Sequence, residues 1–232
     1  MLDEEELDSF EEDSENGNYN HIEAISDHIE KYIGEIEYVL HELVSPLVHI
    51  DVHVIKPIPE RNFYTFVTSG MSEMAMILED GSEKYAEVFI CLPSDWKIGE
   101  EEFEDENNYW PIRLLKSIAR FPHEEETWVG YGHTIQFSDP IEPYASNNKF
   151  IGSILLPPIS FDGEFCLLNY DNHIIEFYLI IPLYEEEMKL KIENGSESLI
   201  TGFNQIQLNE VVDIKRKNIT LDLKQKSKWK FW

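Results

Sequence analysis

The amino-acid sequence predicts a single α+β domain in which helices flank a central, mixed but mostly antiparallel sheet. Stretches rich in β-branched and aromatic residues, which favour strands, are interspersed with amphipathic stretches, which favour helices. Their order lacks the regular βαβ repeat of a doubly wound parallel sheet. With 232 residues and 42% hydrophobic content, the chain can bury about 70% or more of its unfolded surface in one core.

The chain divides into three segments. Residues 1–18 contain nine carboxylates and no Lys or Arg, so we expect a disordered acidic tail that buries too little apolar surface to offset the entropy of ordering. Residues 19–213 form the domain. Residues 214–232 reverse the charge sign with seven Lys or Arg and add three large aromatic side chains. This basic tail either folds back onto the acidic body or provides a separate attachment site.

The first element is a helix predicted over residues 19–44. Apolar residues recur there at three- and four-residue steps and form one stripe, which comprises Ile22, Ile25, Ile29, Ile33, Ile36, Leu40 and Leu43. Pro46 ends this helix, because the residue before a proline is disfavoured in the helical conformation.

Three strands follow the first helix. Residues 47–55 carry β-branched side chains at alternating positions, and residues 63–67 form a second strand that ends in the turn Ser69-Gly70. Residues 85–92 are almost continuously apolar, which is typical of a central strand.

The middle of the chain is predicted to hold a surface loop and then a helix. Residues 97–108 are acidic and lack apolar periodicity, which indicates a loop. The next helix begins at Trp110-Pro111, since a proline in the first turn has no helical N–H to lose. Ile112, Leu115 and Ile118 would face the core.

The last third is predicted to contain two strands and two helices. Residues 150–156 and 174–183 are too rich in β-branched and aromatic residues for helices. Residues 184–193 and 196–205 have helical character, and Asn194-Gly195 between them suits a helix end followed by a turn.

Cysteine usage and hydropathy favour a cytoplasmic protein. Cys91 and Cys166 each lie in an apolar run without metal-ligand spacing, so we expect two buried thiols and no disulfide. The longest apolar runs, such as residues 177–183, fall far short of the roughly 20 residues that a membrane-spanning helix requires, and the acidic N-terminus is unlike a signal peptide.

The net charge of −28 is the compositional feature that most restricts function. Nucleic-acid backbones and anionic membranes would be repelled, so we expect neither as a partner. A basic protein is the opposite case, because complementary charge accelerates association. The alternative is that the charge serves solubility alone.

Two groups of polar residues are candidates for a metal or acid–base site. Asp51 and His53 lie two apart in a strand and share a face with His49. His123 and His133 lie in or near an acidic loop. Polar groups on one strand face more commonly form a hydrogen-bonded network, and zinc-protease spacing is absent. We therefore expect no catalytic residue, metal or cofactor, and keep a metal-dependent hydrolase built from Asp51, His53, His123 and His133 as an alternative.

The loop after the central helix is the candidate binding site for a protein partner. Its glycines, Gly130 and Gly132, allow tight turns that bring aromatic side chains toward a common patch, although packing into the core would explain the same residues. Buried aromatic residues supply much of the binding energy of protein interfaces. The expected partner-binding residues are Glu124, Glu125, Glu126, Trp128, Tyr131 and His133.

Several segments together resemble the Suppressor-of-fused-like domain of bacteria. The similarity runs from about His49 to Asp213 and is carried most clearly by residues 49–55, 63–72, 86–96, 110–135, 154–158, 177–184 and 209–213. Bacterial members of this family are associated with immunity proteins, which bind a cognate secreted toxin, often a nuclease, and block it. The resemblance therefore implies an antitoxin without catalytic activity.

Animal members of the family clasp a short peptide, and the resemblance implies where that groove would lie. It involves the segments that match 119–121 and 130–133, in which a tyrosine and an acid stand where this chain has Phe121 and Gly132. Because those polar groups are missing, the same peptide contacts are not expected. A peptide-binding adaptor with another site remains an alternative to the antitoxin.

Overall fold

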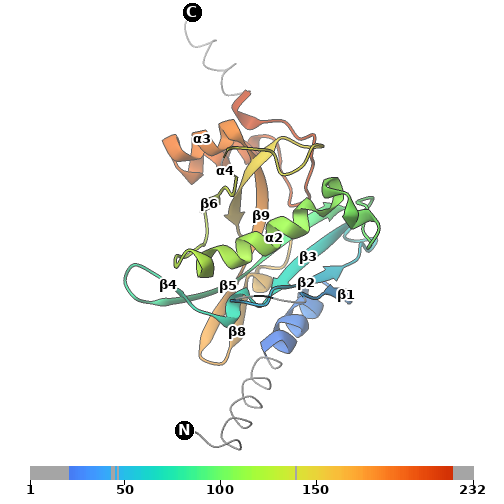
Figure 1. The fold of residues 1–232 in the computed structure, drawn as a ribbon, viewed down its shortest axis with the longest axis vertical. Coiled ribbons are helices and arrows are strands. Elements are labelled where there is room, and N and C mark those ends of the chain that lie inside the picture. Colours follow the sequence, from blue (N-terminus) through green and yellow to red (C-terminus); the bar gives the residue numbers. More distant parts are fainter. Residues whose placement is uncertain (1–20, 43–44, 46, 139, 222–232) are drawn as a thin grey trace, which may run out of the picture.

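One large sheet organises the molecule (Figure 1). The computed structural model describes residues 21–42, 45, 47–138 and 140–221, so the expected acidic tail, Leu43, Pro46 and the end of the basic tail lie outside the described residues. The strand order is β1-β2-β3-β5-β9-β7-β6, with β4 paired to β5 and β8 to β9. Among the strands of the described residues, each pairing is antiparallel except that of β5 with β9. The predicted fold class is confirmed.

The elements follow the sequence in a mixed order. The first half contains a helix over residues 21–32 and then β1 (Ile36–Leu40), β2 (Asp51–Ile55), β3 (Phe63–Ser69), η1 (Met71–Glu73), β4 (Met76–Ile77), β5 (Glu83–Pro93) and η2 (Glu102–Glu104). The second half contains α2 (Glu106–Glu124), β6 (Thr134–Ile135), β7 (Phe150–Leu156), η3 (Gly163–Cys166), β8 (Leu167–Tyr170), β9 (His173–Tyr184), α3 (Glu185–Asn194) and α4 (Ser196–Gln205).

The first helix is shorter than the predicted 19–44. It ends near Ile33, and Gly34 follows with a φ of 138°, a backbone conformation that glycine adopts easily and other residues rarely do. Residues 36–40 then form β1, an edge strand antiparallel to β2. Ile36 and Leu40 fit a helical stripe, but they are equally suited to a strand once β2 offers a partner.

The central helix starts earlier than the predicted Trp110. Asp105 caps it by accepting a hydrogen bond from the Asn107 N–H at 2.9 Å. Pro111 consequently lies inside the helix, where it cannot donate to the carbonyl of Asn107. Asn147 replaces that bond with its side-chain amide, which donates to the Asn107 carbonyl at 3.0 Å. The predicted loop 97–108 is therefore partly helical.

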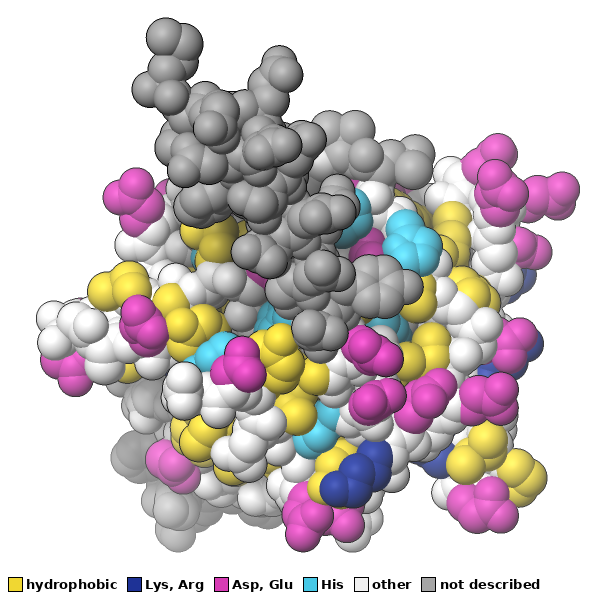
Figure 2. All heavy atoms as spheres, turned by 90° about the horizontal axis from the view of Figure 1, so that it is seen from below, with side chains coloured by type: hydrophobic (Ala, Val, Ile, Leu, Met, Phe, Trp, Pro, Cys, Tyr) yellow, Lys and Arg dark blue, Asp and Glu magenta, His cyan; other side chains and the backbone are white. Residues whose placement is uncertain are grey.

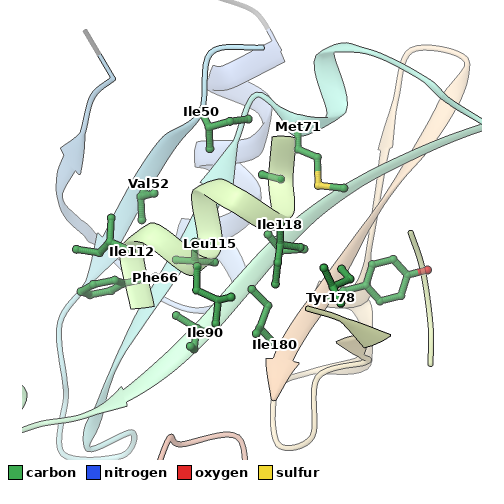
Figure 3. Packing of buried hydrophobic residues seen from close by; sticks show 14 of the residues in the cluster. Ile50, Val52, Phe66, Met71, Ile90, Ile112, Leu115, Ile118, Tyr178 and Ile180 are labelled. Atoms are coloured by element: carbon green, nitrogen blue, oxygen red, sulfur yellow. The ribbon is translucent and has the colours of Figure 1, made fainter. Parts of the chain in front are cut away.

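Helices cover both faces of the sheet, because alternate residues of the central strands point to opposite sides. On one face α2 packs Ile112, Leu115 and Ile118 against sheet residues such as Phe66 and Ile90 (Figure 3). On the other face the helix over residues 21–32 and α4 cover a second apolar cluster, which includes Ile25, Ile29, Phe89, Phe177, Leu199 and Phe203.

A fully buried carboxylate fastens the turn after β3 to the central strand β5. Glu87 accepts hydrogen bonds from the Thr68 hydroxyl at 2.6 Å, the Ser72 hydroxyl at 2.6 Å, and the N–H groups of Gly70 and Ser72 at 3.0 Å each. Gly70 has a φ of 108°, and a Cβ there would lie 1.9 Å from the carbonyl oxygen of His49. The turn therefore depends on both the carboxylate and the glycine.

A buried ion pair fastens the end of the described chain to the domain. Arg216 donates to both carboxylate oxygens of Glu187, at 2.6 and 2.5 Å, and to the carbonyl of Pro182 at 2.7 Å. Ile219 is also buried and packs against Gly202 of α4. Residues 214–221, which the sequence suggests are part of the tail, thus pack on the domain.

We predict that Gly70→Ala destabilises the fold strongly. A non-glycine residue in this conformation costs of the order of 1–3 kcal/mol, and the Cβ would also overlap the His49 carbonyl oxygen. Urea unfolding measures the loss. Gly163→Ala is the control, because a Cβ at that position meets no atom within 4 Å, and it should change stability by less than about 0.5 kcal/mol. Equal stability of the two variants would contradict this role of Gly70.

We predict that Arg216→Met lowers the free energy of unfolding by about 3–5 kcal/mol, because Glu187 would remain buried without its counter-ion. Lys215→Met, at an exposed neighbouring position, should stay within about 0.5 kcal/mol of the unmodified protein. Chemical denaturation of the three proteins tests the difference. Similar midpoints for both variants would show that the ion pair is dispensable.

Candidate functional site

The predicted partner-binding residues belong to the segment 124–133, which links the end of α2 to β6 and is called here the 124–133 loop. Glu124 is the last residue of α2, Glu125 caps it through an N–H that donates to the Phe121 carbonyl at 3.0 Å, and Glu126 has a φ of 47°. All three side chains are exposed. Carboxylates near a helix C-terminus typically cost 0.3–1 kcal/mol each at low ionic strength, so this arrangement does not serve helix stability.

Trp128 and His133 lie together in the second half of the loop. Their ring centroids are 4.2 Å apart, and both side chains are half-buried. Burial lowers the pKa of His133, and the positive charges of Lys191 and Lys84 lower it further. The imidazole is therefore neutral near pH 7 and serves as a packing partner of the tryptophan rather than as a cation.

Tyr131 lines a small apolar hollow, called here the Tyr131 hollow, to which Trp128 and His133 do not contribute. Its side chain is 52% exposed. The hollow has a volume of about 200 Å³ and is lined by Tyr131, Leu156, Pro157, Pro158, Ile159, Ile200, Phe203, Asn204 and Leu208. These residues come from the 124–133 loop, the end of β7 and the segment after it, and α4 and the segment that follows. The structure thus separates Tyr131 from Trp128 and His133.

The four residues of the alternative hydrolase site are not assembled into one centre. Asp51 accepts from His41 at 2.7 Å, from His49 at 3.0 Å and from the Glu42 N–H at 2.9 Å. His53 instead contacts the Ser69 hydroxyl at 2.9 Å, and burial lowers its pKa to about 4. The strand face therefore carries a hydrogen-bonded network. His41, which the sequence did not single out, belongs to it.

The two other histidines of that alternative are engaged separately. His123 lies 2.9 Å from the Met71 carbonyl oxygen, and His133 packs on Trp128. Within the part of the chain that the structure describes, no group of three or more His, Cys, Asp or Glu residues could hold a metal ion.

Glu73 is a titratable residue that the sequence did not single out. It follows the turn held by Glu87, and one of its carboxylate oxygens is buried without a hydrogen-bond partner. Burial, together with the charges of Glu87 and Asp51, raises the pKa of Glu73 to about 7. Sequence reasoning could not find Glu73, because its raised pKa depends on the nearby carboxylates of Glu87 and Asp51, which come from β5 and β2.

Two larger hollows are more polar. One, of about 500 Å³, contains Asn107, Asn108 and Asn147. The amide groups of these three residues hydrogen-bond to neighbouring residues at the start of α2, so they serve the structure there. The other, of about 530 Å³, is bordered by Arg216 and Leu221. The Tyr131 hollow differs from both because no charged side chain lines it.

The surface has a large excess of acidic side chains. On the face in Figure 2, acidic groups are spread widely, whereas Lys and Arg appear in few places. Several cations are already paired with carboxylates, as in Lys56 with Glu37, Lys84 with Glu176 and Arg120 with Glu42. Among the described residues, Glu124, Glu125 and Glu126 form no ion pair. No helix in this part of the chain is sufficiently long and apolar to cross a membrane.

Comparison with known proteins relates most of this chain to one family. The family model described as Suppressor of fused protein (SUFU) matches residues 46–217. The chain is also 24% identical over 200 residues to Uncharacterized protein UU111 of Ureaplasma parvum serovar 3, and the match covers 84% of this chain and 94% of that protein.

Solved structures share the fold. A putative SUFU homologue from Neisseria gonorrhoeae superposes with a TM-score of 0.61 at 17% identity and covers 87% of this chain and 97% of the homologue. The Sufu-Fu complex superposes with a TM-score of 0.61 at 15% identity, and the match covers 91% of this chain and 97% of the matched chain. Drosophila Suppressor of Fused gives 0.60 at 16% identity and covers 90% of this chain, which spans 53% of the Drosophila protein.

We predict that Glu73→Gln stabilises the protein increasingly as pH rises from 5 to 8. The folded-state pKa of Glu73, about 7, exceeds its ordinary value of 4.5. The native state therefore holds this proton more tightly, and the resulting stabilisation, fully present below pH 4.5, is lost as pH rises through about 7. Gln remains neutral throughout. Urea unfolding at both pH values measures the effect, and the exposed Glu79→Gln is the control. A pH-independent difference would refute this assignment.

Proposed function

The chain belongs to the Suppressor of fused (SUFU) family, and we propose that it is a non-catalytic, cytoplasmic immunity protein. In this proposal it binds a cognate basic toxin, such as a nuclease, and covers the toxin's active site. The observation that carries the proposal is the excess of surface carboxylates. Among the described residues, Glu124, Glu125 and Glu126 are exposed, form no ion pair and lie beside an aromatic loop.

The proposed mechanism is electrostatic and steric occlusion. An active site that binds a polyanion presents positive charge, and an acidic protein surface imitates that polyanion. Complementary charge can raise association rates to about 10⁸–10⁹ M⁻¹s⁻¹ at low salt. A typical interface covers roughly 800 Å² on each partner, so a protein of this size can block substrate access without any chemical reaction.

The comparisons support protein binding as the general mode of action. A structural relative is described as the Sufu-Fu complex, so Sufu binds Fu in that structure. Transfer of this property to the present chain is part of the proposal, since 15% identity establishes the fold alone.

The alternative function is that of a peptide-binding adaptor. The surroundings of Phe121 and Gly132 argue against a peptide site like that of the animal relatives. The Phe121 ring packs against Phe137, with centroids 5.8 Å apart. At Gly132 a Cβ would lie 2.9 Å from the Ser196 hydroxyl, so an acidic side chain would require rearrangement. An adaptor would need a different surface.

Co-expression tests the immunity role directly. Each open reading frame of the source genome is expressed in a heterologous host, alone and together with this protein, and growth is measured. The proposal expects a basic protein that arrests growth alone and is tolerated when this chain is present. If no growth-arresting protein is rescued, the immunity role is excluded.

We predict that the triple variant Glu124→Lys, Glu125→Lys, Glu126→Lys slows association with the rescued toxin by at least about tenfold at low salt, because these carboxylates steer the encounter. Stopped-flow or surface-plasmon measurements give the rate. The matched control reverses the charge of Glu100, Glu101 and Glu104, which are equally exposed but lie elsewhere. Equal losses in both triple variants would mean that total charge, and not the 124–133 loop, guides the partner.

A further inference from the structure

We propose that the Tyr131 hollow is the specificity site of the interface and receives one protruding apolar side chain from a basic protein partner. This inference rests on the proposed function and adds the chemistry that the partner must present. Charge would bring the partner to the surface, and the hollow would select it.

The walls of the hollow favour an apolar occupant. Apart from the hydroxyl of Tyr131, the amide of Asn204 is the one polar side-chain group among its nine lining residues, and Leu156 and Phe203 are almost fully buried. Tyr131 and Ile159, by contrast, are 52% and 48% exposed. An apolar side chain placed between them would remove this surface from water, which is favourable in proportion to the area buried.

The hollow is held in shape before any partner arrives. The Gly132 N–H donates to the Leu155 carbonyl at 2.8 Å, the Leu155 N–H donates to the His133 carbonyl at 3.0 Å, and the Ser196 hydroxyl donates to the Gly132 carbonyl at 3.1 Å. These bonds fix the backbone on one side of Tyr131. The opposite wall includes Pro157 and Pro158, whose rings restrict the backbone. A preformed site loses little entropy on binding.

Size decides between a small molecule and a protein side chain. Sites for small molecules typically measure about 300–1,000 Å³ and offer several polar groups that orient the ligand. The Tyr131 hollow measures about 200 Å³ and offers one amide. It therefore suits one large apolar side chain, which is the form that anchor residues of protein interfaces take.

The position of Glu124, Glu125 and Glu126 in the same loop as Tyr131 indicates that the occupant comes from a basic surface. Glu126 precedes Tyr131 by five residues, so the chain between them spans at most about 18 Å. An interface of roughly 800 Å² per partner, with about 20–30 residues a side, can include both the hollow and the three carboxylates. A neutral or acidic partner would gain nothing from Glu124, Glu125 and Glu126 within such an interface.

The test uses random peptides displayed on phage and selected on the full chain. Selected peptides are synthesised and titrated against the unmodified protein, against Asn204→Trp, which places a bulky ring in the hollow, and against Ile192→Trp. Ile192 is 75% exposed on α3 and lies outside the hollow, so it is the matched control. Circular dichroism and urea unfolding confirm that the variants are folded.

The proposal expects basic peptides that share one large apolar residue. Their affinity should fall at least tenfold for Asn204→Trp and stay within twofold for Ile192→Trp. Replacing the apolar residue of the peptide by Ser should weaken binding to the unmodified protein tenfold, with little further loss in Asn204→Trp. Such non-additivity shows that the two positions interact directly.

Other outcomes overturn the inference in distinguishable ways. Basic peptides without an apolar residue, bound equally by both variants, would exclude the hollow and leave the acidic surface intact. Selection of neutral or acidic peptides would contradict the proposed function as well. Light scattering that shows a dimer only when Asn204 is unmodified would assign the hollow to a second copy of this chain. Tighter peptide binding after deletion of residues 222–232 would assign it to the chain's own C-terminal segment.

Discussion

Glu87 lies in the middle of β5 without exposed surface, and its carboxylate accepts hydrogen bonds from the Thr68–Ser72 turn. Burial raises its pKa, and the hydrogen bonds from Ser72 and Thr68 lower it again in part. A carboxyl group in such a place is tolerated only when its lone pairs are satisfied. The turn must therefore keep the backbone conformation that directs these N–H and O–H groups at the carboxylate. Gly70 allows this conformation. From this turn Met71 offers its carbonyl oxygen to His123 of α2, so the constraint extends to the helix that carries the 124–133 loop.

The strands were predictable from sequence wherever burial alone determines them. The β-branched and aromatic runs of β3, β5, β7 and β9 cannot be helical without crowding, and the structure has strands in each of these places. Where the predicted bounds of helices and strands differ from the structure, the cause is a contact with a residue distant in the sequence. Asn147 allows Pro111 to lie inside α2, and β2 draws residues 36–40 into the sheet. Arg216, in the segment predicted as a basic tail, binds Glu187 of α3; folding back onto the acidic body was one of the two alternatives for this tail, but the sequence did not identify Glu187 as the partner. No local pattern contains these partners.

In the candidate site, too, some features could be predicted from the sequence and others could not. The exposure of Glu124, Glu125 and Glu126 follows from three adjacent carboxylates at the end of a helix, which no core could absorb. The placement of the aromatic residues could not be inferred, because Gly132 turns the backbone between Tyr131 and His133 and sends their side chains to different neighbours. The hollow itself is assembled from three separate segments of the chain, around Tyr131, 156–159 and 200–208. Its existence is a property of the fold and has no signal in any one segment.

The acidic surface and the Tyr131 hollow have complementary properties: the charge acts at long range, and the hollow acts at contact. A chain with a formal net charge of −28 attracts any sufficiently basic protein, and salt screens that attraction beyond about 8 Å at physiological ionic strength. Electrostatic attraction is therefore fast but selects poorly among cations. An apolar hollow acts only at contact and is insensitive to salt, so it discriminates by the shape of a single side chain. The proposed immunity role requires both, because one toxin must be selected among many basic cellular proteins. In this proposal the 124–133 loop brings the carboxylates and the hollow into one interface.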